Sequence, residues 1–287
     1  MNLEFAKMHG LGNDFVVFDG VRQAVELTRE RIRAIADRRF GIGCDQVLVL
    51  EPAERSGVDF AYRIYNADGG EVEQCGNGAR CVALFAREAG LTDKDRLRLE
   101  TLGGEIMPRI LPDGRVTVDM GVPHLEGADI PLSEPGEWVR APLEVAGERR
   151  RITAVSVGNP HCVLEVEDAT AAPLSTLGPV LEHHPLFPNR ANVEFVEVRS
   201  PDRIRVRVWE RGAGVTLACG TGACASVVAA RLWDRVGPRA EVELDGGNLT
   251  IEWAGPEEPI LMTGPAVITF RGVLGQWPAS RPATAGP

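Results

Sequence analysis

The pattern of hydrophobic and polar residues predicts two helices that are apolar on almost every side. The first covers residues 79–89 and the second residues 223–233, and a glycine follows each soon afterwards. A helix without a polar face has to be buried, so both are expected in the core rather than on the surface. An amphipathic helix at 28–39 and a weaker helix at 173–183 complete the predicted helices.

Short apolar or alternating runs predict strands before and after these helices. Turn residues at 112–114 and 245–248 join neighbouring runs into hairpins. The predicted strands cover residues 3–8, 15–18, 46–50, 60–66, 96–100, 109–120, 143–145, 151–157, 162–166, 192–198, 204–209, 241–244, 249–253 and 261–270.

Polar residues at the ends of these elements recur in the same order in the two halves of the chain. Their separation is about 145 residues, which indicates an internal duplication. We therefore expect two domains, residues 1–120 with about 264–274, and residues 121–263. Residues 275–287 have little to bury and are expected to form a disordered tail. The matched pairs are Asn13 with Asn159, Gln46 with Asn192, Asn66 with Glu210, and Cys75 with Cys219.

A cysteine and a Gly-x-Gly sequence precede each apolar helix. The two stretches read EQCGNGA at 73–79 and LACGTGA at 217–223, with thiols at Cys75 and Cys219. The first turn of a helix carries unpaired N–H groups and about half a positive charge. It therefore binds carboxylates and lowers the pKa of a nearby thiol from about 8.5 toward neutrality. The sequence predicts two activated thiols and two carboxylate-binding turns.

Duplicated domains commonly pack about a pseudo-twofold axis, which would bring both thiols to one cleft. Thiols on opposite sides of a carbon centre suit its inversion, because one removes a proton and the other delivers a proton to the opposite face. Two facing thiolates would repel, so we expect one thiolate and one thiol. The N–H groups expected to hold a substrate carboxylate are those of Gly76, Asn77, Gly220 and Thr221.

Five motifs along the chain resemble the signatures of the diaminopimelate epimerase family. They read MHGLGNDF at 8–15, CGNGARC at 75–81, SVGNPH at 156–161, WERG at 209–212 and ACGTG at 218–222. The resemblance spans about residues 3–272. It implies an α/β (α+β) fold of two pseudo-symmetric domains, each a mixed or antiparallel sheet wrapped around a central apolar helix. The active site would lie in the cleft between them.

The resemblance also implies a reaction and its residues. Enzymes of that family interconvert LL- and meso-2,6-diaminopimelate in lysine and peptidoglycan-precursor biosynthesis, without pyridoxal phosphate, metal or nucleotide. By this resemblance Cys75 and Cys219 are the acid/base residues, and His161 and Glu210 tune them. Arg211 would pair with the distal carboxylate through its bidentate fork. The implied substrate-binding residues are Asn13, Gln46, Asn66, Gly76, Asn77, Asn159, Asn192, Glu210, Arg211, Gly220 and Thr221.

Composition narrows the class of protein further. The 287 residues carry a net charge of −10 and no basic block, which argues against a nucleic-acid partner. No apolar run approaches the ~20 residues that span a membrane, and residues 1–7 do not resemble a signal peptide, so a cytoplasmic protein is expected. Six irregularly spaced cysteines resemble neither a disulfide framework nor a zinc site, and no metal or cofactor is expected. The family resemblance suggests a homodimer.

Three other interpretations fit parts of the sequence. Gly220-x-Gly222-x-x-Ala225, with Glu243 downstream, meets a relaxed dinucleotide-binding fingerprint, although a cysteine directly precedes its glycines. Two low-pKa thiols would also suit a redox switch. A racemase or epimerase of the same architecture would act on proline or hydroxyproline, but Arg211 and the asparagines favour a substrate with a second amino-acid end.

Overall fold

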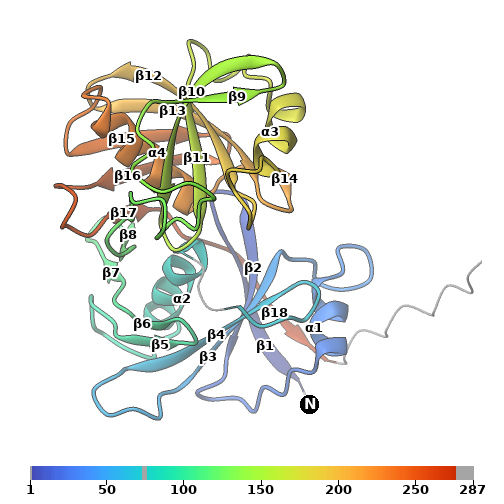
Figure 1. The fold of residues 1–287 in the computed structure, drawn as a ribbon. Coiled ribbons are helices and arrows are strands. Elements are labelled where there is room, and N and C mark those ends of the chain that lie inside the picture. The colour runs from blue at the N-terminus through green and yellow to red at the C-terminus, as the bar shows by residue number, and fades with distance from the viewer. Residues whose placement is uncertain (1, 73–75, 276–287) are drawn as a thin grey trace, which may run out of the picture. The chain divides into compact units, whose positions relative to one another are not determined.

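The computed structural model describes residues 2–72 and 76–275 of the chain, drawn as a ribbon in Figure 1. These residues form two compact units. Unit 1 takes the chain up to Val118 together with the segment from Gly264 onward, and unit 2 is Asp119–Thr263. No helix in the described part of the chain is long and apolar enough to cross a membrane.

Unit 1 is built on a mixed sheet. Its described strands are β1 (Leu3–Gly10), β2 (Asn13–Asp19), β3 (Gln46–Pro52), β4 (Phe60–Asn66), β5 (Leu99–Thr101), β6 (Gly104–Ile106) and β18 (Val267–Leu274). They are ordered β18-β1-β2-β3-β4-β5-β6. The pairs β2–β3 and β4–β5 are parallel and the other neighbours are antiparallel. Strands β7 (Arg109–Ile110) and β8 (Val116–Asp119) form an antiparallel hairpin.

Two helices, α1 (Arg29–Ala36) and α2 (Gly76–Glu88), cover opposite faces of this sheet (Figure 1). Helix α1 is shorter than the predicted span 28–39. Thr28 caps its N-terminus by accepting a hydrogen bond from the Arg31 N–H. At the other end the Asp37 carboxylate accepts the N–H groups of Arg39 and Phe40. This local turn competes with the helix and ends it early.

Unit 2 also contains a mixed sheet. Its described strands are β9 (Ala141–Val145), β10 (Glu148–Ser156), β11 (Pro160–Glu165), β12 (Asn192–Ser200), β13 (Arg203–Glu210), β14 (Gly214–Val215), β15 (Arg239–Leu244), β16 (Gly247–Glu252) and β17 (Leu261–Gly264). Their order is β17-β16-β15-β13-β12-β11-β10-β9, and β14 pairs with β13. The pairs β11–β12 and β13–β15 are parallel.

The two helices of unit 2 pack on its sheet in different ways. Leu177 and Leu181 of α3 (Leu174–Glu182) lie in an apolar cluster with Val193 and Phe195 of β12. Helix α4 (Gly220–Leu232) packs against β10, β11, β12 and β13, and every residue from Gly222 to Ala230 is buried. The prediction of a core helix after Cys219 is confirmed.

Helix α2 is also a core helix, but it carries one polar residue that the apolar pattern did not emphasise. Arg80 is fully buried in the second turn. Its guanidinium donates to the Asn77 side-chain oxygen at 2.8 Å and to the Pro265 carbonyl at 3.2 Å. Hydrogen bonds of this kind are what a buried cation requires.

Strand pairing repeats between the units, as expected for an internal duplication. Phe15 of β2 pairs with Gln46 of the parallel strand β3, and His161 of β11 pairs with Asn192 of the parallel strand β12. In each unit an antiparallel strand and then a buried helix follow this parallel pair. The two halves therefore share topology as well as sequence order.

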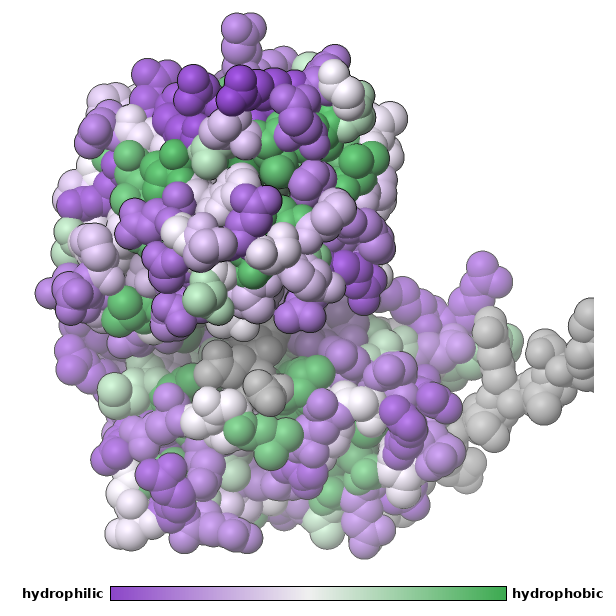
Figure 2. Space-filling model, viewed as in Figure 1, coloured by the Kyte–Doolittle hydropathy of each residue, from purple (hydrophilic) through white to green (hydrophobic). Residues whose placement is uncertain are grey.

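The molecular surface is mainly hydrophilic on the face shown in Figure 2, where apolar residues occur in small groups between polar ones. Strand β18 lies at one edge of the unit 1 sheet. It exposes Val267, Phe270 and Val273 by 41%, 47% and 58%. An edge strand with exposed apolar side chains is a surface suited to pairing with another chain.

Candidate active site

Cys219 occupies the N-cap position of α4 and has an extended backbone conformation. Its sulfur accepts a hydrogen bond from the Gly222 N–H at 3.3 Å and lies 3.5 Å from the Thr221 hydroxyl oxygen. The helix was predicted over residues 223–233 and begins three residues earlier, at Gly220. The sulfur therefore takes the place that a serine or aspartate oxygen usually has at a helix N-terminus.

The expected lowering of the Cys219 pKa is wrong for this structure. Burial raises the pKa of the thiol well above its ordinary value, and the nearby carboxylates of Glu210 and Glu194 raise it further. Hydrogen bonds from Thr221 and Gly222 act in the opposite direction but do not prevail. Desolvation disfavours a thiolate more than one helix turn favours it, so Cys219 is a protonated thiol here.

His161 and Glu194 form a fully buried pair beside this helix start. Their side chains are 0% exposed, and His161 Nδ1 lies 2.7 Å from Glu194 Oε1. The other carboxylate oxygen, Oε2, is buried and has no hydrogen-bond partner among the described residues. A buried carboxylate with an unpaired oxygen is costly, and such groups concentrate at functional sites.

A chain of hydrogen bonds joins His161 to the sulfur. His161 Nε2 lies 2.9 Å from the Asn159 side-chain oxygen, and the Asn159 amide nitrogen donates to the Thr221 hydroxyl at 3.3 Å. The Thr221 hydroxyl in turn contacts the Cys219 sulfur. Four predicted site residues of unit 2 thus lie in one network, together with Glu194, which the sequence analysis missed.

Two further predicted residues flank the loop between β13 and α4. The Asn192 side-chain oxygen accepts the Arg211 backbone N–H at 3.0 Å, and its amide nitrogen donates to the Pro160 carbonyl at 3.1 Å. The Arg211 guanidinium donates to the Asn189 carbonyl at 3.1 Å and is exposed. Asn192 therefore helps to fix the loop between β13 and α4, while the Arg211 side chain is exposed.

Glu182 of α3 also holds the loop between β13 and α4. The sequence analysis missed this residue. Its buried carboxylate accepts the Trp209 indole N–H at 2.7 Å and the Gly212 N–H at 2.9 Å. Glu210 accepts a hydrogen bond from the Thr216 hydroxyl. Glu182 thereby sets the position of the WERG motif.

The predicted residues of unit 1 form a matching network. The Asn77 amide nitrogen donates to the Asn13 side-chain oxygen at 3.3 Å. The equivalent pair in unit 2 is bonded in the opposite direction, because Asn159, the match of Asn13, donates to Thr221. The Gln46 amide nitrogen donates to the Asn66 oxygen at 2.9 Å. Helix α2 begins at Gly76, three residues before the predicted start at residue 79. Cys75 itself lies outside the described residues.

The missed residues had weak signals in the sequence. Glu194 lies in a predicted strand where polar and apolar residues alternate, and such a glutamate is normally solvent-facing. Glu182 lies near the end of the weak helix predicted at 173–183, and Arg80 interrupts the apolar run predicted at 79–89. The one available clue was position, because Glu194 and Arg80 lie close in sequence to the motif residues Asn192 and Asn77.

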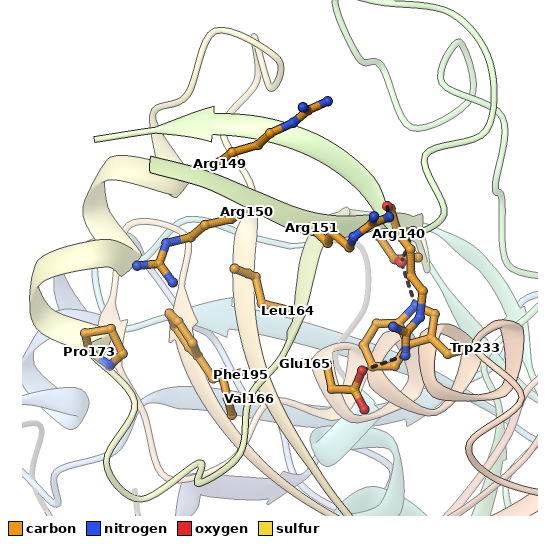
Figure 3. Close-up of a pocket in the computed structure, with 11 residues that line it drawn as sticks. Arg140, Arg149, Arg150, Arg151, Leu164, Glu165, Val166, Pro173, Phe195 and Trp233 are labelled. Carbon is orange, nitrogen blue, oxygen red and sulfur yellow. Dashed lines mark hydrogen bonds and ion pairs between the residues drawn. The ribbon is translucent and has the colours of Figure 1, made fainter. Parts of the chain in front are cut away.

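A separate cavity of about 290 Å³ in unit 2 is lined mainly by residues of β10, β11 and β12, together with Trp233 at the C-terminal end of α4 (Figure 3). Arg140 lies over the Trp233 ring there and pairs with Glu165 at 2.5 Å. Arg150 extends toward Pro173 (Figure 3). None of the predicted site residues lines this cavity, so it is distinct from the cluster at Cys219.

Comparison with solved structures defines the fold class. The chain is similar to a phenazine biosynthesis protein of the PhzF family from Bacillus anthracis, with a TM-score of 0.68, 17% identity, and coverage of 96% of this chain and 99% of that one. It is also similar to a hydroxyproline epimerase from Agrobacterium vitis, with a TM-score of 0.67, 19% identity, and coverage of 95% and 92%. The chain therefore has the two-unit fold that these proteins share.

Closer relatives define the family within that fold. The family model described as diaminopimelate epimerase matches residues 5–126 and 153–269. The diaminopimelate epimerase of Aromatoleum aromaticum is 58% identical, over 96% of this chain and 99% of its own length. The enzyme of Thioalkalivibrio sulfidiphilus is 55% identical over the same shares. This chain belongs to the diaminopimelate epimerase family.

Proposed function

We propose that the protein is a cofactor-independent two-base epimerase that interconverts LL- and meso-2,6-diaminopimelate in lysine and peptidoglycan-precursor biosynthesis. Family membership over nearly the whole chain supports this reaction. The proposal depends on the position of Cys219, a buried thiol at the N-terminus of α4 whose sulfur accepts from the Gly222 N–H and contacts the Thr221 hydroxyl.

In the reaction direction that begins with Cys219 as a protonated thiol, Cys219 is the proton donor. Because the sulfur accepts from Gly222 and contacts the Thr221 hydroxyl, its own S–H proton remains available for transfer. Cys75, as thiolate, removes the α-proton from one face of the substrate carbon, and Cys219 delivers its proton to the other face. The carbon is inverted, and the two sulfurs exchange protonation states. The reverse reaction then starts with the roles exchanged.

The departing proton leaves negative charge on the α-carbon and its carboxylate. The unpaired N–H groups at the first turns of α2 and α4 stabilise that charge, and Gly76, Asn77, Gly220 and Thr221 supply them. The thiolate left on Cys219 keeps the Gly222 N–H as a partner and gains a charge-assisted bond from Thr221. Arg211 pairs with the distal carboxylate, which fixes which end of the substrate reacts.

The remaining proposed substrate contacts follow the duplicated pattern. Asn13, Asn66 and Asn159 hold the amino and carboxylate groups, while Gln46 and Asn192 support the neighbouring turns. Glu210 lies beside the Cys219 thiol and contacts the substrate ammonium group. His161 acts on the same thiol through Asn159.

We also propose that the enzyme works as a cytoplasmic homodimer. The exposed apolar residues Val267, Phe270 and Val273 on the edge strand β18 support a second copy as partner. Sedimentation of the purified chain tests this, and substitution of Phe270 by glutamate should shift a dimer toward monomer.

The reaction is tested by incubating LL-diaminopimelate with the enzyme in D2O, with no cofactor added. We expect meso product that carries deuterium at the inverted carbon, because the delivering thiol has exchanged with solvent. The same assay with proline and hydroxyproline should show no exchange. Exchange into proline without exchange into diaminopimelate would assign the protein to the alternative substrate class.

A further inference from the structure

The His161–Glu194 pair has no counterpart in unit 1, although the two units share their topology. Glu194 pairs with Val163 in the parallel β11–β12 register, and Leu48 pairs with Val17 in the same way in β2–β3. His161 likewise corresponds to Phe15. Phe15 and Leu48 are both fully buried and apolar. The duplicated site is thus made unequal by two residues at matching positions.

The hydrogen-bond partners determine where protons lie on His161. The oxygen of Asn159 can only accept, so His161 Nε2 must carry a proton and donate it. At Nδ1 one proton lies between the ring and Glu194 Oε1, carried by either partner. In both cases the pair is neutral overall, and Nε2 is a donor.

This arrangement sets the direction of each hydrogen bond in the chain that leads from His161 to the Cys219 sulfur. Since the Asn159 oxygen accepts from His161, its amide nitrogen faces Thr221 and donates to the hydroxyl oxygen. The Thr221 hydroxyl proton is then free to point at Cys219, whose sulfur lies 3.5 Å away. A histidine with the opposite tautomer would place two lone pairs against each other at Asn159.

Glu194 also lies close to the helix start itself. A Cβ atom at Gly222 would stand 2.7 Å from Glu194 Oε1 and 3.3 Å from the Cys219 sulfur. The titratable groups around this carboxylate are His161 and Cys162 on β11, Glu210 on β13, and Cys219 at the start of α4. Its second oxygen is buried and has no partner among the residues that the structure describes, so packing alone does not explain a glutamate here.

We propose that Glu194 is a positioning residue for Cys219. Its carboxyl group shares one proton with His161 Nδ1 while Nε2 keeps a proton of its own, and so directs the Asn159 amide and the Thr221 hydroxyl toward the sulfur. This role rests on the proposed function of Cys219 as an acid/base residue. It also makes the Cys219 side of the site differ from the described part of unit 1, where Phe15 and Leu48 occupy the matching positions.

The first test compares two substitutions of Glu194. In Glu194→Gln the new amide can donate to His161 Nδ1, so the Nε2–H form and the direction of the chain are kept. Glu194→Leu introduces the residue that unit 1 has at the matching position. In this variant His161 Nδ1 loses its partner. We expect kcat to fall about 10- to 100-fold in the leucine variant, clearly less in the glutamine variant, and KM to stay within about threefold in both.

The second test reads the proton positions directly. Long-range ¹H–¹⁵N spectra of protein labelled at histidine show which ring nitrogen carries hydrogen, and the signal missing from His161→Phe identifies His161. We expect Nε2 to be protonated in the wild type and in Glu194→Gln. In Glu194→Leu nothing holds Nδ1, so the Asn159 amide can turn over, and we expect a mixture of the Nε2–H and Nδ1–H forms. An unprotonated Nε2 in the wild type, or an unchanged tautomer in Glu194→Leu, would overturn the proposal.

The double variant His161→Phe/Glu194→Leu tests whether misfolding explains the lower kcat expected for Glu194→Leu. It copies the apolar pair that unit 1 already accommodates, and replacing a buried polar pair by apolar residues is often neutral for stability. We expect it to unfold near the wild-type temperature and to be as slow as Glu194→Leu. Wild-type kcat in this folded variant would refute the role of Glu194.

The matched control is Glu165→Gln on β11, a carboxylate paired with Arg140 and Arg235 away from the cluster. It should leave kcat and the His161 signal unchanged. Failure of the proposed function would give a different result, namely no deuterium exchange in the wild type. The tautomer measurement needs no substrate and would still decide the role of Glu194.

Discussion

Gly222 and Glu194 are in such close contact that only glycine fits at the third residue of α4. A Cβ atom there would stand 2.7 Å from the Glu194 carboxylate oxygen, closer than real Cβ contacts. Glu194 cannot easily withdraw, because His161 holds the same oxygen at 2.7 Å. The second glycine of the Gly-x-Gly sequence is therefore required by a buried carboxylate, in addition to giving a ligand access to the backbone.

Gly222→Ala should destabilise the protein, although alanine is the better helix former by about 1 kcal/mol. We expect a loss of about 1–3 kcal/mol in the free energy of unfolding, because the added methyl group overpacks a rigid site. Urea denaturation measures it. The control is Gly255→Ala, where no atom lies within 4 Å of the new Cβ. Equal stability of the two variants would contradict the close contact.

Cys219→Ala should lower epimerisation by about 10²- to 10⁴-fold or more, because one of the two proton-transfer groups is lost. Calorimetry should still detect substrate binding. Cys75→Ala should behave alike if the two thiols act as a pair. The control is Cys44→Ala, which removes a thiol whose pKa burial raises to about 12 and which should retain turnover. Near-normal activity of either alanine variant would refute the two-base assignment.

Arg211→Lys should raise the KM for diaminopimelate about tenfold with little change in kcat. A lysine is a point charge and cannot form the parallel pair of hydrogen bonds that a guanidinium makes with a carboxylate. Steady-state kinetics measures both constants. Arg239→Lys, at an exposed arginine beside Glu252, is the matched control. An unchanged KM would mean that the distal carboxylate is held elsewhere.

Asp14→Asn should lower stability at neutral pH by on the order of 1–2 kcal/mol and much less in acid. Burial opposes ionisation of Asp14, but hydrogen bonds from Arg38 and Lys7 prevail and lower its pKa. A lowered folded-state pKa stabilises the protein above the unfolded value near 3.9, and this contribution is lost as pH falls through the folded value.

The measurement for Asp14 is the free energy of unfolding in urea between pH 7 and pH 2. The gap between wild type and Asp14→Asn should be constant above about pH 5 and close as the solution is acidified. Asp113→Asn, at an exposed carboxylate, provides the control and should show little effect at any pH. A gap as wide at pH 2 as at pH 7 would assign the loss to packing instead of charge.

The sequence predicted the helices at the two cysteine motifs because their signals are local. Glycines mark the start, and the apolar residues from Ala223 onward leave no face for water. The end of α1 was predicted too late, since Asp37 turns the chain through its own side chain. That competition involves only neighbouring residues, but periodicity does not reveal which hydrogen bond prevails.

The protonation of Cys219 required the tertiary structure. A helix N-terminus lowers a thiol pKa when water can reach the site, and that part of the argument depends on sequence alone. Burial and the carboxylates of Glu210 and Glu194 reverse the direction. These residues are distant in sequence from most of what surrounds them, so their effect on one sulfur depends on how the strands pair.

The sequence by itself therefore determined the duplication, the positions of the two buried helices and the family of the protein, because each depends on patterns along the chain. Only the tertiary structure decided that His161 and Glu194 form a buried pair beside Cys219, in a place where unit 1 has Phe15 and Leu48. A glutamate in an alternating strand looks solvent-facing until a helix covers that face of the sheet. Burial then converts an ordinary polar residue into one that controls hydrogen bonds around it.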